Sequence, residues 1–314
     1  MSQRTHLVVG AGPIGSAVAR RLAAAGDRVR VVTRSGSGPD LPGVERVAAD
    51  ASDAMRLGEL AAGSDVLYNC VNPQYHRWAT DWPPIAAALL RAAETSGAVL
   101  VTTSNLYGYG ELDGPMTEQT PLNGTGAKAR VRIRMWEDAL AAHRAGRIRA
   151  TEARGADYVG PGAESHLGER TVPKLLAGKT VQVLGSPDTR HTWTYTEDMA
   201  ATLVAIGADE RAWGRAWHVP SALECTQREA IARLAALAGV PMPKVTTVPG
   251  VLLRALGLVN PLIRELPEVA YQLERPFVMD SSAAQRELGL VPTPADDVLH
   301  AILDGFRARE RRAA

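Results

Sequence analysis

Short apolar runs alternate with stretches of helical spacing along the first half of the chain. The first run, residues 7–9, is followed by a glycine-rich turn and then by Ile14, Val18 and Leu22, which lie on one face of a helix. Gly26 follows this stretch, and glycine is a common residue at the end of a helix. The pattern predicts a strand, a turn and a helix, in that order.

The same alternation continues toward the middle of the chain. Further apolar runs of strand length lie at residues 29–32, 44–48, 66–68, 98–102 and 148–153. Residues 85–92 have helical spacing and separate two of these runs. Short buried strands that alternate with helices are typical of a parallel sheet covered by helices on both faces. We therefore expect the α/β class, with a doubly wound parallel sheet of the Rossmann type.

The second half of the chain has a different character. Glycine- and proline-rich turns separate short apolar runs at 181–184 and 192–195, and residues 298–306 have helical spacing. We interpret this half as a smaller cap over the carboxyl ends of the sheet, where ligands of such folds bind. The predicted division is a dinucleotide-binding domain at 1–160 to which 188–222 returns, a substrate-binding cap at 161–187 and 223–295, and a C-terminal helix and tail at 296–314.

Composition excludes several classes of protein. The 314 residues include 35 basic and 34 acidic side chains, so the net charge of +1 gives nucleic-acid binding little electrostatic support. Cys70 and Cys225 are too few for a zinc site or a disulfide framework, and we expect no metal. No stretch approaches the roughly 20 apolar residues of a membrane helix. We expect a cytoplasmic protein with a small-molecule substrate and with neither nucleic acid nor membrane as a partner.

The strongest chemical motif is Gly10-Ala11-Gly12-Pro13-Ile14-Gly15. It follows a predicted strand and opens a predicted helix, which is the context that supports a G-x-G-x-x-G match. Gly10 permits a tight turn, Gly12 lets a pyrophosphate approach the backbone, and Gly15 lets helix and strand pack closely. The helix that starts at Pro13 and Ile14 then directs free N–H groups toward the phosphates. The motif predicts dinucleotide binding.

The end of the second predicted strand indicates which dinucleotide binds. An NAD site normally has an acidic residue there, which binds the ribose 2′-hydroxyl, whereas this chain has Thr33-Arg34-Ser35. A guanidinium beside two hydroxyls suits a 2′-phosphate, so we expect NADP; the alternative is that Arg34 is a solvated loop residue. The residues expected near the adenine, the ribose and the nicotinamide follow the next strands: Asp50, Ala51, Cys70, Val71 and Asn72.

Several further motifs resemble those of one family. They are Thr102-Thr103-Ser104-Asn105-Leu106-Tyr107-Gly108, Arg154-Gly155-Ala156-Asp157-Tyr158-Val159-Gly160-Pro161, Tyr195-Thr196-Glu197-Asp198 and Arg275-Pro276-Phe277-Val278-Met279-Asp280. Together with the glycine motif they make nearly the whole chain resemble the atypical and extended short-chain dehydrogenases/reductases, also called NAD-dependent epimerase/dehydratases. The resemblance implies a catalytic Thr103, with Thr102 beside the cofactor and Lys128 at the nicotinamide ribose.

One departure from the family pattern concerns its Tyr-x-x-x-Lys signature, in which the phenol is the acid/base. Four residues before Lys128 stands Gly124, which cannot transfer a proton. We expect that Gly124→Tyr would place a side chain able to face the cofactor. The other groups that could carry the proton near the nicotinamide are Tyr107 and His76, with Tyr75 and Tyr158 nearby. The alternative for His76 is that it is an ordinary, partly buried loop histidine that carries no proton in the reaction.

The sequence leaves three functions open: an NADP(H)-dependent oxidoreductase or epimerase acting on a small carbonyl or alcohol, a non-redox isomerase, cyclase or lyase, and an NADP(H)-sensing protein. Tyr75, Tyr158, His191 and Trp193 are the residues expected to bind a substrate, and the polar and aromatic side chains of His191 and Trp193 in the cap favour an enzyme. Since members of the resembling family often dimerise through two helices, residues 85–90 and 131–140 are a candidate homodimer interface. The arginines within 130–134 are expected on the solvent side of their helix.

Overall fold

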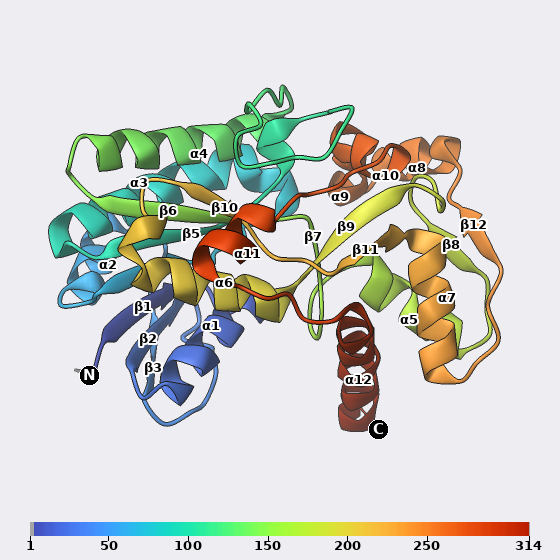
Figure 1. The fold of residues 1–314 in the computed structure, drawn as a ribbon, viewed down its shortest axis with the longest axis horizontal. Helices are drawn as coiled ribbons and strands as arrows, with labels where there is room; N and C mark the ends of the chain where they lie inside the picture. The colour runs from blue at the N-terminus through green and yellow to red at the C-terminus, as the bar shows by residue number, and fades with distance from the viewer. Residues whose placement is uncertain (1–2, 314) are drawn as a thin grey trace.

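A seven-stranded parallel sheet forms the centre of the computed structural model, which describes residues 3–313 (Figure 1). The strand order is β3-β2-β1-β4-β5-β6-β10, so the chain winds outward from β1 in both directions. The strands are β1 (Thr5–Val9), β2 (Arg28–Thr33), β3 (Val44–Ala48), β4 (Val66–Asn69), β5 (Val99–Asn105), β6 (Arg149–Gly155) and β10 (Ala216–His218). This confirms the expected doubly wound α/β fold.

Helices cover both faces of this sheet. Within β1 the side chains alternate, because Val8 packs into the core under α1 and α6 while Leu7 and Val9 pack into the core under α2, α3 and α4. The covering helices are α1 (Pro13–Ala24), α2 (Ala54–Ala61), α3 (Trp78–Ser96), α4 (Ala127–Arg144) and α6 (Thr196–Ala208). Two such cores make the sheet a rigid platform for the loops at its carboxyl edge.

Most of the second half of the chain, apart from α6 and β10, forms a smaller layer beside this platform (Figure 1). Its strands pair as β11-β9-β7 and β12-β8, and helices α5, α7 and α12 pack around a third core. The strands are β7 (Asp157–Val159), β8 (Val181–Val183), β9 (Arg190–Tyr195), β11 (Leu223–Thr226) and β12 (Val245–Thr247). The helices are α5 (Val172–Leu176), α7 (Gln227–Ala238), α8 (Gly250–Gly257), α9 (Pro261–Arg264), α10 (Tyr271–Glu274) and α12 (Ala295–Ala313). Helix α11 (Ser282–Leu288) belongs to the platform instead, because Ala283 and Ala284 pack into the core under α1 and α6. The layer does not include it. We call this layer the cap.

Short helical turns complete the structure: η1 (Tyr75–Arg77), η2 (Tyr107–Tyr109), η3 (His166–Arg170), η4 (Glu210–Ala212) and η5 (Leu266–Val269). Turns η1 and η2 follow β4 and β5, at the edge of the sheet where ligands of such folds bind. No helix in the described part of the chain combines the length and the apolar character needed to cross a bilayer.

A buried ion pair lies on β6 and contacts η2. The guanidinium of Arg154 donates from Nε to Glu152 at 2.7 Å and from a terminal nitrogen to the hydroxyl of Tyr109 at 2.8 Å. Both side chains of the ion pair are almost fully buried. Each charge is therefore compensated inside the protein, which is the condition under which a buried pair is tolerated.

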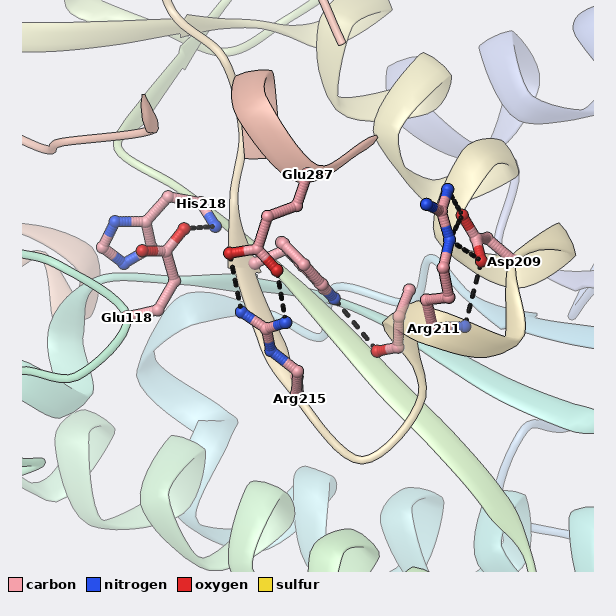
Figure 2. A network of polar contacts seen from close by, with 8 residues as sticks. Glu118, Asp209, Arg211, Arg215, His218 and Glu287 are labelled. Atoms are coloured by element: carbon pink, nitrogen blue, oxygen red, sulfur yellow. Dashed lines mark hydrogen bonds and ion pairs between the residues drawn. The ribbon is translucent and has the colours of Figure 1, made fainter. Parts of the chain in front are cut away.

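His218 on β10 extends this network. Its ring contacts the hydroxyl of Tyr109 through Nε2 at 2.6 Å and the backbone carbonyl of Asp280 through Nδ1 at 2.8 Å. Figure 2 shows its backbone N–H donating to Glu118, and also shows the ion pair of Glu287 with Arg215, which directly precedes β10. Burial lowers the pKa of His218 to about 4, so the ring is neutral near pH 7.

Stability should therefore decrease as the pH falls below about 6.5, the ordinary histidine pKa. The folded state of His218 binds its proton only near pH 4, whereas the unfolded state binds it near 6.5, so acid favours unfolding. We expect a loss of about 2 kcal/mol between about pH 7 and pH 5 from this group. Urea unfolding at both values measures it. His218→Gln should remove this part of the slope and His76→Gln, at an exposed site, should not; equal slopes in both variants would contradict the assignment.

Candidate active site

The glycine turn between β1 and α1 forms a cradle that side chains would fill. Gly10 has a φ of +99°, and a Cβ added there would lie 2.5 Å from the carbonyl oxygen of Cys70. A Cβ at Gly15 would collide with the carbonyl of Gly10, while Gly12 faces open space. Since Pro13 begins α1 and no side chain caps its start, the free N–H groups of the first turn face the same space. These residues fit the pyrophosphate of a dinucleotide.

Hydroxyl groups gather at the end of β2. The Thr33 hydroxyl donates to the backbone carbonyl of Ser37 at 2.9 Å. The Ser35 hydroxyl donates to the side-chain hydroxyl of Ser37 at 3.0 Å. Arg34 is exposed, and no acidic side chain forms an ion pair with it within residues 3–313. The end of β2 thus offers donors and one uncommitted guanidinium.

Asp50 lies near Arg34, at the end of β3. The backbone N–H and then the hydroxyl of Ser52 hold the pKa of Asp50 below its usual range, and the charge of Arg34 adds to this effect. The carboxylate is therefore ionised and exposed, while Ala51 beside it is half-buried against the core of α2 and α3. This places Asp50 on the same side of the sheet edge as Arg34.

The ends of β4 and β5 bring Cys70 and Thr103 together. The Thr103 hydroxyl donates to Cys70 Sγ at 3.6 Å, and burial raises the pKa of the thiol to about 12, so it stays protonated. Thr102 is buried, whereas Val71 is half-buried and Asn72 is exposed. Sulfur is a weak acceptor, so a stronger acceptor placed in this region could take the Thr103 hydrogen bond.

Lys128, at the start of α4, is held by two carboxylates of the cap. Its ammonium forms ion pairs with Glu265 and, at 3.2 Å, with Glu268, and its backbone N–H donates to Glu268 at 2.7 Å. The ammonium also lies 4.5 Å from the centre of the Tyr75 ring. Its side chain is almost fully buried, so Lys128 joins the sheet platform to the cap.

Two phenols lie beside this lysine. The Tyr75 hydroxyl on η1 donates to the Tyr107 hydroxyl on η2 at 3.2 Å. Both rings pack against Trp78, with ring centres 5.4 and 5.9 Å away. Burial raises the pKa of both phenols, so both are protonated near pH 7. The predicted catalytic Tyr107 and the predicted substrate-binding Tyr75 therefore form one cluster with Lys128.

The expectation that Gly124→Tyr would place a side chain toward the cofactor is wrong. A Cβ at Gly124 would lie 2.5 Å from the carbonyl of Tyr107 and 2.6 Å from the Cβ of Ala129. Helix α4 begins only at Ala127, so Gly124 lies before the helix and packs against η2. No side chain fits at this position without movement of the backbone.

Other predicted residues lie in different surroundings. His76 is exposed on η1, and Tyr158 on β7 uses its hydroxyl to donate to the carbonyl of Ser104. Trp193 was expected to bind a substrate, but it is 1% exposed and packs in the core of the cap, so its side chain is not available to one. The arginines of 130–134 are not all on the solvent side, because Arg132 is buried between the rings of Trp78 and Trp82.

The buried His191 contacts the half-buried Asp157. His191 contacts the carbonyl of Gln272 through Nδ1 at 3.0 Å, and its Nε2 lies 3.4 Å from the Asp157 carboxylate. Burial acts to raise the pKa of Asp157, but contact with His191 and the charge of His166 outweigh it and lower the pKa. Asp157 belongs to the motif after β6, but the local sequence does not predict its contact with His191, because His191 lies on β9.

Comparisons with known proteins agree with this architecture. The sequence model of the NAD dependent epimerase/dehydratase family matches residues 6–219, which is more than half of the chain. Those residues run from β1 to the end of β10 and include the glycine turn, Thr103 and Lys128. No curated protein is similar enough in sequence to count as a relative.

Solved structures share the fold at low identity. The dTDP-glucose 4,6-dehydratase DesIV from Streptomyces venezuelae, solved with NAD, is 22% identical, has a TM-score of 0.79 and matches over 98% of each chain. The epimerase Mth375 from Methanothermobacter thermautotrophicus is 18% identical with a TM-score of 0.82 over 99% of this chain and 94% of its own. The UDP-glucose 4-epimerase from Thermotoga maritima is 16% identical with a TM-score of 0.80 over 98% of this chain and 99% of its own. These likenesses establish the fold.

Proposed function

Because the chain belongs to the NAD-dependent epimerase/dehydratase family, we propose that it is an NADP(H)-dependent oxidoreductase or epimerase acting on a small carbonyl or alcohol. The observation that carries this proposal is the cluster of Tyr107, Tyr75 and Lys128. It supplies a phenol beside a lysine although Gly124 stands where the family has its catalytic tyrosine. In this proposal, Tyr107 on η2 takes the role that the family gives to the tyrosine four residues before the lysine.

The dinucleotide would supply the hydride, and residues of this chain would hold it. The glycine turn suits the pyrophosphate, Arg34 and its neighbouring hydroxyls suit a 2′-phosphate, and Asp50 suits the adenine. Lys128 would bind the nicotinamide ribose, as the family resemblance implies, by exchanging one of its contacts with Glu265 and Glu268 for the ribose. Structural neighbours are solved with NAD, so the preference for NADP rests on the end of β2 in this chain.

Tyr107 would donate the proton. Because Tyr75 donates its own hydrogen to the Tyr107 oxygen, the hydrogen of Tyr107 is left to donate to a substrate oxygen. Burial raises the pKa of Tyr107, so the phenol is protonated near pH 7 and carries the proton that reduction of a carbonyl requires. Thr103 would turn its hydroxyl from the Cys70 sulfur to the same oxygen and polarise it.

Arg34→Asp should shift the preference from NADP toward NAD. The substitution removes a charge-assisted hydrogen bond to the 2′-phosphate and adds a charge that repels it. NADPH binding should weaken about 10- to 100-fold. Fluorescence titration with NADPH and NADH measures the ratio of the two affinities. Arg28→Asp, at the exposed start of β2, is the matched control. Unchanged NADPH affinity in Arg34→Asp would remove Arg34 from the site.

The proposed activity is tested by NADPH oxidation in the presence of a panel of small aldehydes and ketones. Consumption of NADPH with at least one carbonyl, and loss of it in Lys128→Met, is the expected result. Tight NADPH binding with no consumption across the panel would instead support a sensor or a non-redox reaction.

A further inference from the structure

The cap exposes a cluster of large apolar side chains on α8 and α9. Ten large hydrophobic residues are exposed in the described chain, and six of them lie within 251–262. Their exposed fractions range from 40% to 81%. They are Val251, Leu252, Leu256, Leu258, Val259 and Leu262. We call this cluster the α8–α9 surface.

Helices α8 and α9 have almost no buried residues. Gly257 is the one buried residue of α8, and α9 has none. Most helices of this length are stabilised by packing an apolar face against the protein, and an isolated helix so short is marginal in water. The two helices pack on each other, with the Arg264 guanidinium donating to the carbonyl of Gly257 at 3.2 Å. Their apolar side chains nevertheless remain in contact with water.

The charged side chains of residues 230–264 are all positive, and the acidic Glu265 and Glu268 that follow are paired with Lys128. Residues 230–264 contain Arg233, Lys244, Arg254 and Arg264, and not one aspartate or glutamate. Arg233 is paired with Asp296, whereas Arg254 and Arg264 form no ion pair within residues 3–313. The α8–α9 surface therefore combines exposed apolar side chains with exposed positive charge.

Its position in the molecule is peripheral. Figure 1 places α8 and α9 at the end of the cap, on the side of the molecule opposite the N-terminal strands. The chain then continues directly to Glu265 and Glu268, which hold Lys128. The exposed cluster thus adjoins the cap segment that covers the candidate active site.

We propose that the α8–α9 surface docks on an anionic lipid bilayer. Leucine and valine side chains gain by leaving water for the acyl region, and arginines beside them gain from anionic headgroups. A second copy of the chain suits this surface less well, because a two-fold contact would bring equal patches with the same positive charges together without an acidic partner. This revises the expectation of no membrane partner, which rested on the absence of a spanning stretch and did not address contact at a lipid surface.

Co-sedimentation of the full chain with vesicles tests the proposal. We expect binding to mixed phosphatidylcholine and phosphatidylglycerol vesicles, weaker binding to phosphatidylcholine alone, and weakening by added salt. Leu258→Ser with Val259→Ser should weaken binding at least about 30-fold, since both side chains are about four-fifths exposed and available for insertion. Arg254→Gln should weaken binding to the anionic vesicles about fivefold and leave binding to the neutral ones unchanged.

Met55→Ser with Val291→Ser is the matched control, because these side chains are equally exposed but lie outside the α8–α9 surface. The control should bind like the unaltered chain, and thermal melts should show that both double variants remain folded. Absence of vesicle binding, or an equal loss in the control, overturns the proposal. So does sedimentation of the free protein as a dimer that Leu258→Ser with Val259→Ser dissociates, since a second copy would then cover this surface.

Discussion

Replacing Glu152 with leucine should lower the free energy of unfolding by about 3–5 kcal/mol. The substitution leaves the Arg154 guanidinium in the interior without its carboxylate, and both side chains are at most 4% exposed. Tyr109 still accepts one hydrogen bond from Arg154, but a neutral hydroxyl does not compensate a buried charge. Urea denaturation followed by circular dichroism measures the change.

Two further variants separate the loss of the pair from other effects. Glu152→Leu combined with Arg154→Met removes both charges and should recover most of the lost stability, because apolar replacements of a buried pair are often nearly neutral. Glu224→Ala breaks the exposed pair with Arg190 and should cost less than about 1 kcal/mol. A double variant as unstable as Glu152→Leu would show that the buried charge of Arg154 is not the cause.

Tyr107→Phe should reduce the rate of carbonyl reduction by about 10²- to 10⁴-fold, with little effect on NADPH binding. The phenylalanine keeps the ring against Trp78 but removes the hydroxyl that we propose as the proton donor. Tyr75→Phe removes only a supporting neutral hydrogen bond, worth about 1 kcal/mol, so it should slow the reaction less than about 10-fold. Single-turnover kinetics with saturating NADPH measure both.

Tyr195→Phe is the matched control for these variants. Tyr195 is a half-buried tyrosine that precedes α6 and lies outside the cluster of Tyr107, Tyr75 and Lys128. Its loss should leave the rate unchanged. An equal reduction in Tyr75→Phe and Tyr107→Phe would contradict the assignment of the proton to Tyr107, because the two hydroxyls would then act as a unit.

The sequence predicted the sheet and the glycine turn because both depend on local patterns. Apolar runs identify strands, and the spacing of Gly10, Gly12 and Gly15 describes a turn completed within six residues. The boundary of β6 was less well predicted, since the strand continues through Arg154 and Gly155. A buried arginine in a strand is compatible with the core here only because Glu152 lies beside it.

The rest of the site depends on contacts between distant parts of the chain. Glu265 and Glu268 reach Lys128 across 137 and 140 residues, and no local spacing links them. Arg132 has the pattern of a solvent-facing residue on its own helix, but the indoles of Trp78 and Trp82 receive its guanidinium from another helix. The obstruction at Gly124 comes partly from Ala129 nearby in the sequence and partly from the backbone of η2, which the sequence around position 124 does not specify.

The most direct test of the proposed function follows deuterium from NADPH labelled at C4 of the nicotinamide into the carbonyl panel by mass spectrometry. The account predicts that the unaltered protein transfers the label to carbon of at least one carbonyl, and that Tyr107→Phe slows this transfer by about 10²- to 10⁴-fold. Label retained on bound NADPH with every carbonyl would contradict the account, as would transfer that proceeds at the same rate in Tyr107→Phe.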